Sequence, residues 1–236
     1  MTFVALYRTL FQVCTSRARL LSFAVVAAIG IGVAVLLRST YAGDEVERAA
    51  SFVDWFGLSL VAPIAALVFG TAVLGDPIED GTYVYLWLRP IGRWQISLAG
   101  YLATATVVVP VSLIPTVVGA ALLSPDPMLI AAAAVSTSLA AFAYSAVFVL
   151  MGQVTQRGLV WGVAYLLIFE QFIARGGKGL GFLSVHSHAV SFLARTVDRR
   201  INLDYFSRPT ALVVSVLMAA ALLGWSVRRQ ATMDVA

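Results

Sequence analysis

Three residues that can do acid–base or metal chemistry, Glu170, His186 and His188, lie close together in the second half of this sequence. Glu170 stands near the end of a long apolar run, where a carboxylate is costly unless it is paired or faces water. It could serve substrate passage or proton coupling. The structural alternatives are an ion pair with Arg175 or Arg157, or an interfacial cap.

The two histidines are two positions apart, so in an extended segment both side chains could lie on one side as metal ligands. Only Asp198 or Asp204 could add a third ligand, and no cysteine is near, so no metal site is predicted. Ser184 is close to His186 in sequence but lacks the strained Gly-x-Ser-x-Gly turn of a hydrolase nucleophile. We therefore expect no catalytic residue of this kind.

Nucleotide and nucleic-acid sites also lack support in the sequence. The glycine-rich stretch 176–179 contains Lys178 but not the glycine spacing, or the following Ser or Thr, of a phosphate-binding loop. The net charge of +4 is small and comes with no basic tract, which argues against nucleic-acid binding. Cys14 is the single cysteine, so an internal disulfide cannot form. The chain is expected to hold no cofactor of its own.

Composition places these side chains in a membrane protein, because 60% of the residues are hydrophobic and only 12% are charged. A membrane-spanning helix needs about 20 mainly apolar residues. We expect an all-α polytopic protein with six transmembrane helices in a single transmembrane domain, 1–236. The predicted spans are Leu20–Leu37, Phe52–Leu74, Ile96–Leu123, Met128–Met151, Leu159–Ala174 and Thr210–Val227.

An even number of spans puts both chain ends on one side of the membrane. If the termini are cytoplasmic, the 16 basic residues are divided evenly between the two sides of the membrane, so their count alone does not determine the orientation. The first span is usually dominant, and Arg8, Arg17 and Arg19 precede it, whereas Arg38 and Arg48 share their loop with acids. We predict a multi-pass protein of a bacterial plasma membrane with both termini cytoplasmic.

Two segments outside the spans have their own patterns. In segment 1–19, Phe3, Tyr7 and Phe11 recur at helical spacing, which predicts an amphipathic interfacial helix, either an elbow that transmits motion or a simple anchor. Segment 175–209 is too hydrophobic for a plain loop and too broken for a span. Short re-entrant helices in an extracellular semi-hydrophobic segment are expected there.

The third predicted span contains two prolines, whereas the fourth is rich in small residues. Pro110 and Pro115 should kink or locally unwind the third span, and with Glu170 and Gln171 they are candidates for a substrate path. The fourth span is rich in Ala and Ser, and small residues let helices approach closely. It is therefore expected to be buried.

The connector at 76–95 is polar and then aromatic, between two long apolar runs. Acidic residues precede Gly81-Thr82, and Pro90 follows the aromatic stretch, as at the ends of a short helix. This predicts a short amphipathic helix parallel to the membrane, with aromatics available to a protein groove or to an interfacial aromatic belt. The acids are Asp76, Glu79 and Asp80, and the aromatics are Tyr83, Tyr85 and Trp87.

The connector resembles that of the permease subunits of type-2 ABC exporters, in which acid-Gly-Thr and Pro-x-x-Arg bracket a cytoplasmic coupling helix. The six spans, the amphipathic leader and the segment before the last span are similar as well. The matching positions are Glu79, Gly81, Thr82, Pro90 and Arg93.

This resemblance implies a transport subunit that is not itself an enzyme. It would work by alternating access with two copies of a separate ATP-binding subunit, which hold ATP and Mg, and with a second permease copy, identical or paralogous. Tyr83, Tyr85 and Trp87 would join the coupling contact, and Arg157 would add a second one. Few charges in the spans favour an amphipathic, lipid-like, drug or peptide substrate. The alternatives are a stand-alone carrier or membrane enzyme using Glu170 and the two histidines, or a scaffold without transport.

Overall fold

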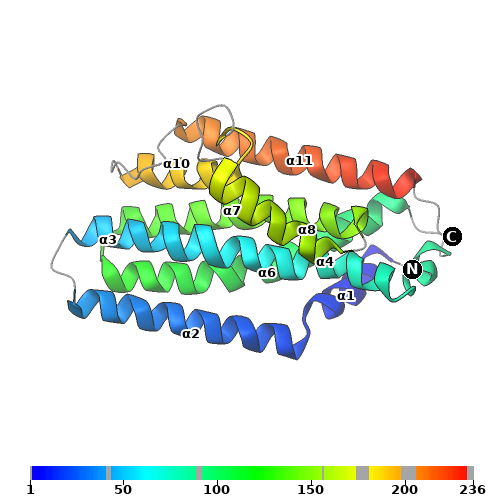
Figure 1. The fold of residues 1–236 in the computed structure, drawn as a ribbon, viewed down its shortest axis with the longest axis horizontal. Coiled ribbons are helices and arrows are strands. Elements are labelled where there is room, and N and C mark those ends of the chain that lie inside the picture. The colour runs from blue at the N-terminus through cyan, green and yellow to red at the C-terminus, as the bar shows by residue number, and fades with distance from the viewer. Residues whose placement is uncertain are drawn as a thin grey trace.

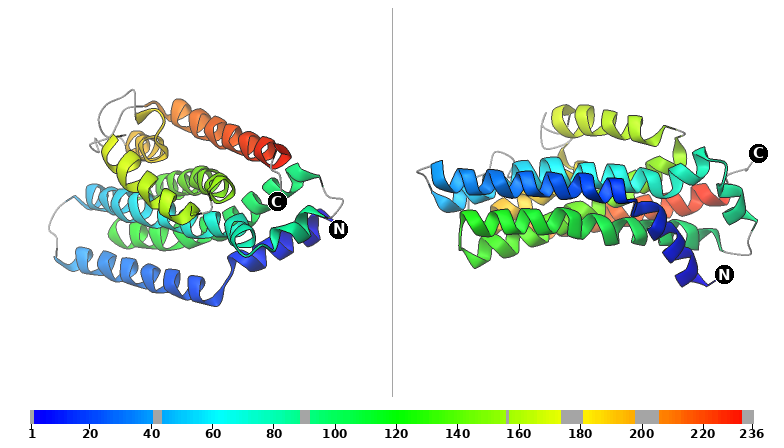
Figure 2. Two further views of the ribbon diagram at one scale, coloured as in Figure 1. Left: turned by 45° about the vertical axis from the view of Figure 1, so that its right-hand side comes forward. Right: turned by 90° about the horizontal axis from the view of Figure 1, so that it is seen from below.

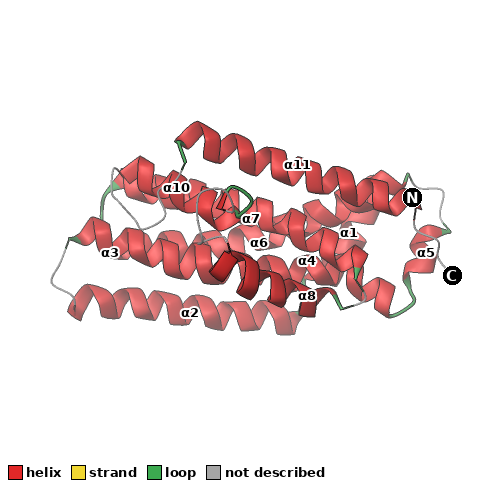
Figure 3. Cartoon of the chain, turned by 45° about the horizontal axis from the view of Figure 1, so that its top comes forward, coloured by secondary structure: helices red, strands yellow, loops and turns green. Residues whose placement is uncertain are grey.

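The computed structural model describes residues 2–40, 44–88, 92–155, 157–173, 181–197 and 206–232. Within these ranges almost every residue is helical and there is no strand, which confirms the expected all-α class (Figure 3). The helices are α1 (Phe3–Cys14), α2 (Arg17–Thr40), α3 (Glu45–Phe52), η1 (Val53–Val61), α4 (Ala62–Glu79), α5 (Tyr83–Trp87), α6 (Arg93–Leu123), α7 (Pro127–Val154), α8 (Gly158–Ala164), η2 (Tyr165–Ile173), α10 (Val185–Val197) and α11 (Arg208–Thr232).

In the described part of the chain, five helices are long and apolar enough to cross a membrane, which makes this a multi-pass membrane protein by length and composition. They are α2, the continuous helix formed by α3, η1 and α4, then α6, α7 and α11. The fifth predicted span, Leu159–Ala174, instead forms α8 and η2, whose described part ends at Ile173. At about 1.5 Å per residue, the described part of this helix is shorter than a hydrocarbon core roughly 30 Å thick.

The long helices run side by side along one axis and give the molecule two ends (Figures 1 and 2). The connector end comprises α1, α5 and the last turn of α11, that is, residues 2–19, 76–88, 92–95 and 226–232. The far end comprises the connections at 38–40, 44–48 and 123–127, together with α10. Helices α8 and η2 lead the chain from the end of α7 back toward α10. The start of α1 and the end of α11 therefore both lie at the connector end (Figure 1).

The centre of the bundle is the contact between α4 and α7, which is the most extensive contact between two helices in the described structure. Gly70 lies against Phe148, and Gly152 approaches Thr71 so closely that a Cβ atom on Gly152 would lie 2.5 Å from the Thr71 carbonyl oxygen. Small residues thus allow the close approach that the Ala- and Ser-rich sequence predicted. By contrast, most side chains of α2 and α11 remain exposed at the periphery.

Helix α6 contains both prolines of the predicted substrate path, yet it continues unbroken from Arg93 to Leu123. The local unwinding that was one expected effect of the prolines does not occur. The helix continues although each proline lacks the N–H that would donate a backbone hydrogen bond. Pro110 and Pro115 instead help line a hollow of about 240 Å³ between α2 and α6. The irregular helical segments, with π-type hydrogen bonding, are η1 and η2, which contain no proline.

The leader forms a shorter helix than the predicted 1–19, since α1 ends at Cys14 and a new helix starts at Arg17. Its apolar side packs on the bundle, where Leu6 and Leu10 are fully buried. Tyr7 donates its hydroxyl proton to Thr106 Oγ1 of α6 at 3.1 Å. Segment 1–19 is thus a helix joined by a sharp elbow to α2, with its apolar face against protein.

Candidate functional site

The connector reverses the chain direction between α4 and α6. Gly81 adopts φ +67°, a left-handed conformation that residues with a Cβ atom seldom take. Thr82 Oγ1 donates to the Pro77 carbonyl oxygen at 3.3 Å and braces this turn. A short helix, α5, then spans Tyr83–Trp87 as the sequence predicted. Residues 89–91, with Pro90, and the Trp87 side chain lie outside the described part of the structure.

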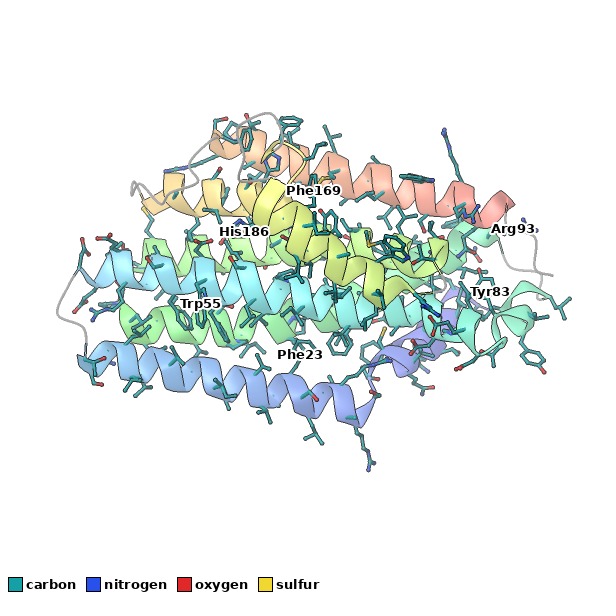
Figure 4. All side chains as sticks on the ribbon, in the orientation of Figure 1. Phe23, Trp55, Tyr83, Arg93, Phe169 and His186 are labelled. Carbon is teal, nitrogen blue, oxygen red and sulfur yellow. The ribbon has the colours of Figure 1, made fainter. Side chains whose placement is uncertain are left out.

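The inner side of the connector is fastened to the end of α11. Tyr83 is only 3% exposed, and its hydroxyl donates to Gln230 Oε1. Arg93 Nη1 donates to the backbone carbonyl oxygen of the same Gln230 at 3.3 Å. Burial raises the pKa of Tyr83 to about 12, so the phenol keeps its proton at neutral pH. Tyr83 near the start of the connector and Arg93 near its end therefore both bind one residue of α11; Figure 4 labels these two side chains.

A second fastening joins the start of the connector to the α1–α2 elbow. Arg19 Nη2 lies 2.7 Å from Asp76 Oδ2, and Arg19 Nη1 donates to the Val13 carbonyl oxygen at 3.3 Å. The Arg19 and Asp76 side chains are partly exposed, so the ion pair contributes little to stability but fixes the relative position of two elements. Sequence reasoning missed Arg19 and Gln230, since no local pattern connects them with the connector.

The outer side of the connector is open. Tyr85 is 70% and Leu88 75% exposed, and the adjoining Glu79 and Asp80 are exposed as well. Large apolar side chains bordered by acids on a projecting turn form a surface typical of a protein contact. Of the predicted coupling residues, Tyr83 thus faces inward, whereas Glu79 and Tyr85 face outward.

Arg157 lies at the same end of the bundle but on another connection, between α7 and α8, where it is exposed. Ser226 Oγ donates to Gln153 Oε1 at 2.9 Å, which ties this connection to the end of α11. The structure therefore brings Arg157, the connector and the last turn of α11 to one end.

Glu170 is almost fully buried near the far end, at 4% exposure. Its carboxylate accepts hydrogen bonds from Ser184 Oγ at 2.6 Å, from the Val185 backbone N–H at 3.1 Å and from the Tyr165 hydroxyl at 3.0 Å. Val185 is the first residue of α10, and a negative charge at a helix N-terminus is favourable. Among the alternatives in the sequence, this geometry is that of a cap.

The two ion pairs considered for Glu170 fare differently. Arg157 lies at the opposite end of α8 and η2, so it is not the partner of this carboxylate. Arg175 and the Gln171 side chain lie outside the described part of the chain. The hydroxyl and amide donors of Tyr165, Ser184 and Val185 account for the burial of the charge without them.

His186 forms a polar cluster with η1. Its Nε2 lies 2.9 Å from Asp54 Oδ1 and also 2.9 Å from Ser59 Oγ (Figure 4). In a Ser–His–Asp triad the carboxylate and the serine occupy different ring nitrogens, so that the ring can pass a proton between the serine and its leaving group. Here both partners share one nitrogen. The cluster therefore lacks the geometry of a hydrolase triad.

His188 lies on the same helix as His186, two residues further on, so their side chains leave α10 in different directions. Helix α10 lies in segment 175–209, where short helices were expected, and its geometry excludes the alternative in which both rings lie on one side of an extended segment. His188 Nε2 donates to the Phe182 carbonyl oxygen at 2.8 Å, and its ring stacks on Phe206 with centroids 4.6 Å apart. Burial lowers the pKa of His188, so the ring is neutral at neutral pH.

Metal-binding geometry is likewise not seen in the described ranges, where no group of three or more His, Cys, Asp or Glu side chains converges. The arrangement that remains for a functional contact is the connector, with its inner side fastened and its outer side exposed. Neither a model of a known protein family nor a curated protein matches the chain, so its function has to be argued from this surface and from the fold.

Proposed function

We propose that this chain is the membrane-spanning permease subunit of an ATP-driven exporter of the ABC type. The observation that carries the proposal is the connector between α4 and α6. It projects from the end of the bundle, exposes Tyr85 and Leu88 beside two acids, and is held from within by Tyr83. A separate ATP-binding subunit would bind this outer side.

The proposed topology has six crossings. Helices α8 and η2 would be the additional one, since they lead the chain back between the two ends of the bundle (Figure 1). Both termini would then be cytoplasmic in a bacterial plasma membrane, on the same side as the connector. Helix α1 would lie in the membrane interface, and α10 would dip into the outer leaflet under cover of α7 and α11.

The coupling would run through the two fastenings of the connector. Two copies of the ATP-binding subunit, with ATP and Mg, would close on nucleotide binding and displace the connectors of two permease copies. Tyr83 and Arg93 would pass this displacement to Gln230 of α11, and Asp76 would pass it to Arg19 at the α1–α2 elbow. Such a displacement changes the permease only if the subunit binds its two conformations with different affinity.

The substrate class follows from the few charges along the long helices. An amphipathic, lipid-like, drug or peptide substrate fits these surfaces better than a bare ion does. Because Glu170 caps α10, it is a poor candidate for direct substrate contact, and α6 with its two prolines is the better one.

The test is co-purification of the tagged chain with the ATP-binding subunit encoded beside it. We expect wild type to retain the subunit and Glu79→Arg to lose it without loss of membrane insertion. Arg93→Glu should also lose it, but Arg93 holds Gln230 as well, so this variant is less selective. A matched control is Glu45→Arg, an exposed acid at the far end, which should behave as wild type.

A wild-type chain that purifies stably without any ATP-binding subunit would contradict the proposal. Activity of that isolated chain, lost on replacement of Glu170, His186 or His188, would favour the stand-alone carrier or membrane enzyme. Retention of the subunit without substrate-stimulated ATP hydrolysis would favour a scaffold.

A further inference from the structure

A large apolar groove runs along one side of the bundle and is lined by residues of α7, the α8–η2 helix and α11. Its volume of about 720 Å³ lies in the range of small-molecule sites, about 300–1,000 Å³. The other apolar hollow, between α2 and α6, has about a third of this volume. The volume of the groove is therefore larger than that of an ordinary furrow between two neighbouring helices.

Each wall of the groove is one face of a helix. Met218, Leu222 and Trp225 of α11 recur at spacings of four and three, and Trp161, Tyr165 and Ile168 do so on the opposite wall. Both tryptophans are about 60% exposed, so the groove opens sideways. In a membrane, this sideways opening would face the bilayer, so an acyl chain of a lipid could enter the groove.

The end of the groove at the connector end is basic. A second hollow of about 740 Å³ shares Trp225 with the groove and is lined by Arg228 and Arg229. Arg157 is exposed at the start of α8, and the bond between Gln153 and Ser226 holds this region next to α11. Arg228 and Arg229 are both exposed.

We propose that the groove binds one anionic phospholipid from the leaflet at the connector end. An acyl chain would lie between the α8–η2 helix and α11, and the phosphate would lie beside Arg228 and Arg229. An apolar trough that ends in guanidinium groups complements both parts of such a lipid, because arginine binds phosphate oxygens through two parallel hydrogen bonds. The inference does not rest on the proposed transport function and applies equally to a carrier or a scaffold.

The test uses the two tryptophans of the groove as reporters. In a W55F/W87F/W94F chain, only Trp161 and Trp225 remain. This full-length chain is placed in phosphatidylcholine vesicles that contain a small fraction of dibrominated phosphatidylglycerol or, separately, dibrominated phosphatidylcholine. Bromine quenches tryptophan on contact, so the ratio of quenching gives the relative affinity. We expect a preference for phosphatidylglycerol of about 25-fold, since two basic residues at the membrane surface contribute about fivefold each.

Further variants distinguish the contribution of the two arginine charges from that of the shape of the groove. R228Q/R229Q should abolish the preference, whereas R228K/R229K should retain most of it and show that the fold tolerates change there. Ala164→Phe fills the groove and should reduce quenching by both lipids. Ala28→Phe on the exposed side of α2 is the matched control and should leave quenching unchanged.

Equal quenching by the two brominated lipids in the unsubstituted groove would overturn the proposal, as would a preference that persists in R228Q/R229Q. If neither lipid quenches Trp161 and Trp225 and the chain is dimeric by cross-linking, a second copy occupies the groove instead, and the lipid site is refuted.

Discussion

The two ends of the bundle use polar residues in opposite ways. At the far end, the Glu170 carboxylate and the His186 ring are buried and hydrogen-bonded within the protein. At the connector end, Glu79 and Asp80 remain exposed next to Tyr85 and Leu88. Buried polar groups that are satisfied internally hold elements in place, whereas exposed apolar and acidic groups on a projecting turn are suited to a partner.

The same contrast appears in how the elements are fastened. Helix α10 is held by one carboxylate that receives three donors, so its position depends on a buried charge. The connector is held by the bond between Tyr83 and Gln230, by Arg93, and by the half-exposed pair of Arg19 and Asp76. We infer that the far end is the rigid part and the connector end the movable one.

The largest expected effect is at Glu170. Replacement by Ala leaves the donors of Tyr165, Ser184 and Val185 without their acceptor and should lower the free energy of unfolding by about 3 kcal/mol. Glu170→Gln keeps one acceptor oxygen and should cost less. Thermal unfolding in detergent measures both. Unchanged stability of Glu170→Ala would remove the basis for calling the far end rigid.

The inner fastening of the connector should have a smaller effect. Tyr83→Phe removes the hydroxyl donor to Gln230 and should cost about 1 kcal/mol. Hydrogen exchange of segment 83–88 should become faster, while that of α10 stays as in wild type. Tyr85→Phe, on the exposed side of the same helix, is the control. Equal acceleration in both variants would show that the Tyr83 bond does not restrain the connector.

The ion pair at the elbow should matter less again. Asp76→Asn should lower stability by about 0.5 kcal/mol, because a half-exposed pair is screened by water. Raising the salt concentration should reduce wild-type stability toward that of the variant. A loss of several kcal/mol would mean that the elbow is part of the rigid core.

The smallest effect should be a pH dependence from His188. Its pKa is lowered by burial from the ordinary 6.5, so below about pH 6.5 the unfolded chain takes up a proton that the folded chain does not. Stability from this group is present above pH 6.5 and is lost as the pH falls toward the folded pKa. The comparison is with His188→Gln, which keeps His186 and Asp54 on their own contacts and should have a flatter stability curve. Identical curves would contradict burial of the ring.

The long helices could be predicted from the sequence because apolar runs report length directly. The close packing of α7 followed from its Ala and Ser content, and α5 followed from the acids and Gly81-Thr82 before it. The predicted fifth span, Leu159–Ala174, was the shortest of the six, and α8 with η2 follows its bounds closely. The π-type hydrogen bonding of η2 and the absence of unwinding in α6 could not be deduced, because hydropathy and the presence of proline do not determine the local hydrogen-bond pattern.

The contacts that fasten the candidate site could not be predicted. Arg19 and Asp76 are 57 positions apart, and Tyr83 and Gln230 are 147 apart, so their pairing depends on which helices are neighbours in the bundle. A short helix in segment 175–209, by contrast, could be predicted from its broken apolar pattern, and α10 lies there with Val185, Ala189 and Leu193 at helical spacing.

The most direct test of the proposed coupling surface is a photo-crosslink from the exposed side of the connector. A benzoylphenylalanine at position 85, in membranes that contain the neighbouring ATP-binding subunit, should crosslink to that subunit, and the yield should change when ATP is added. The same group at position 45, exposed at the far end, should give no such product. A crosslink from position 45, or none from position 85 while the two proteins co-purify, would contradict binding at the connector.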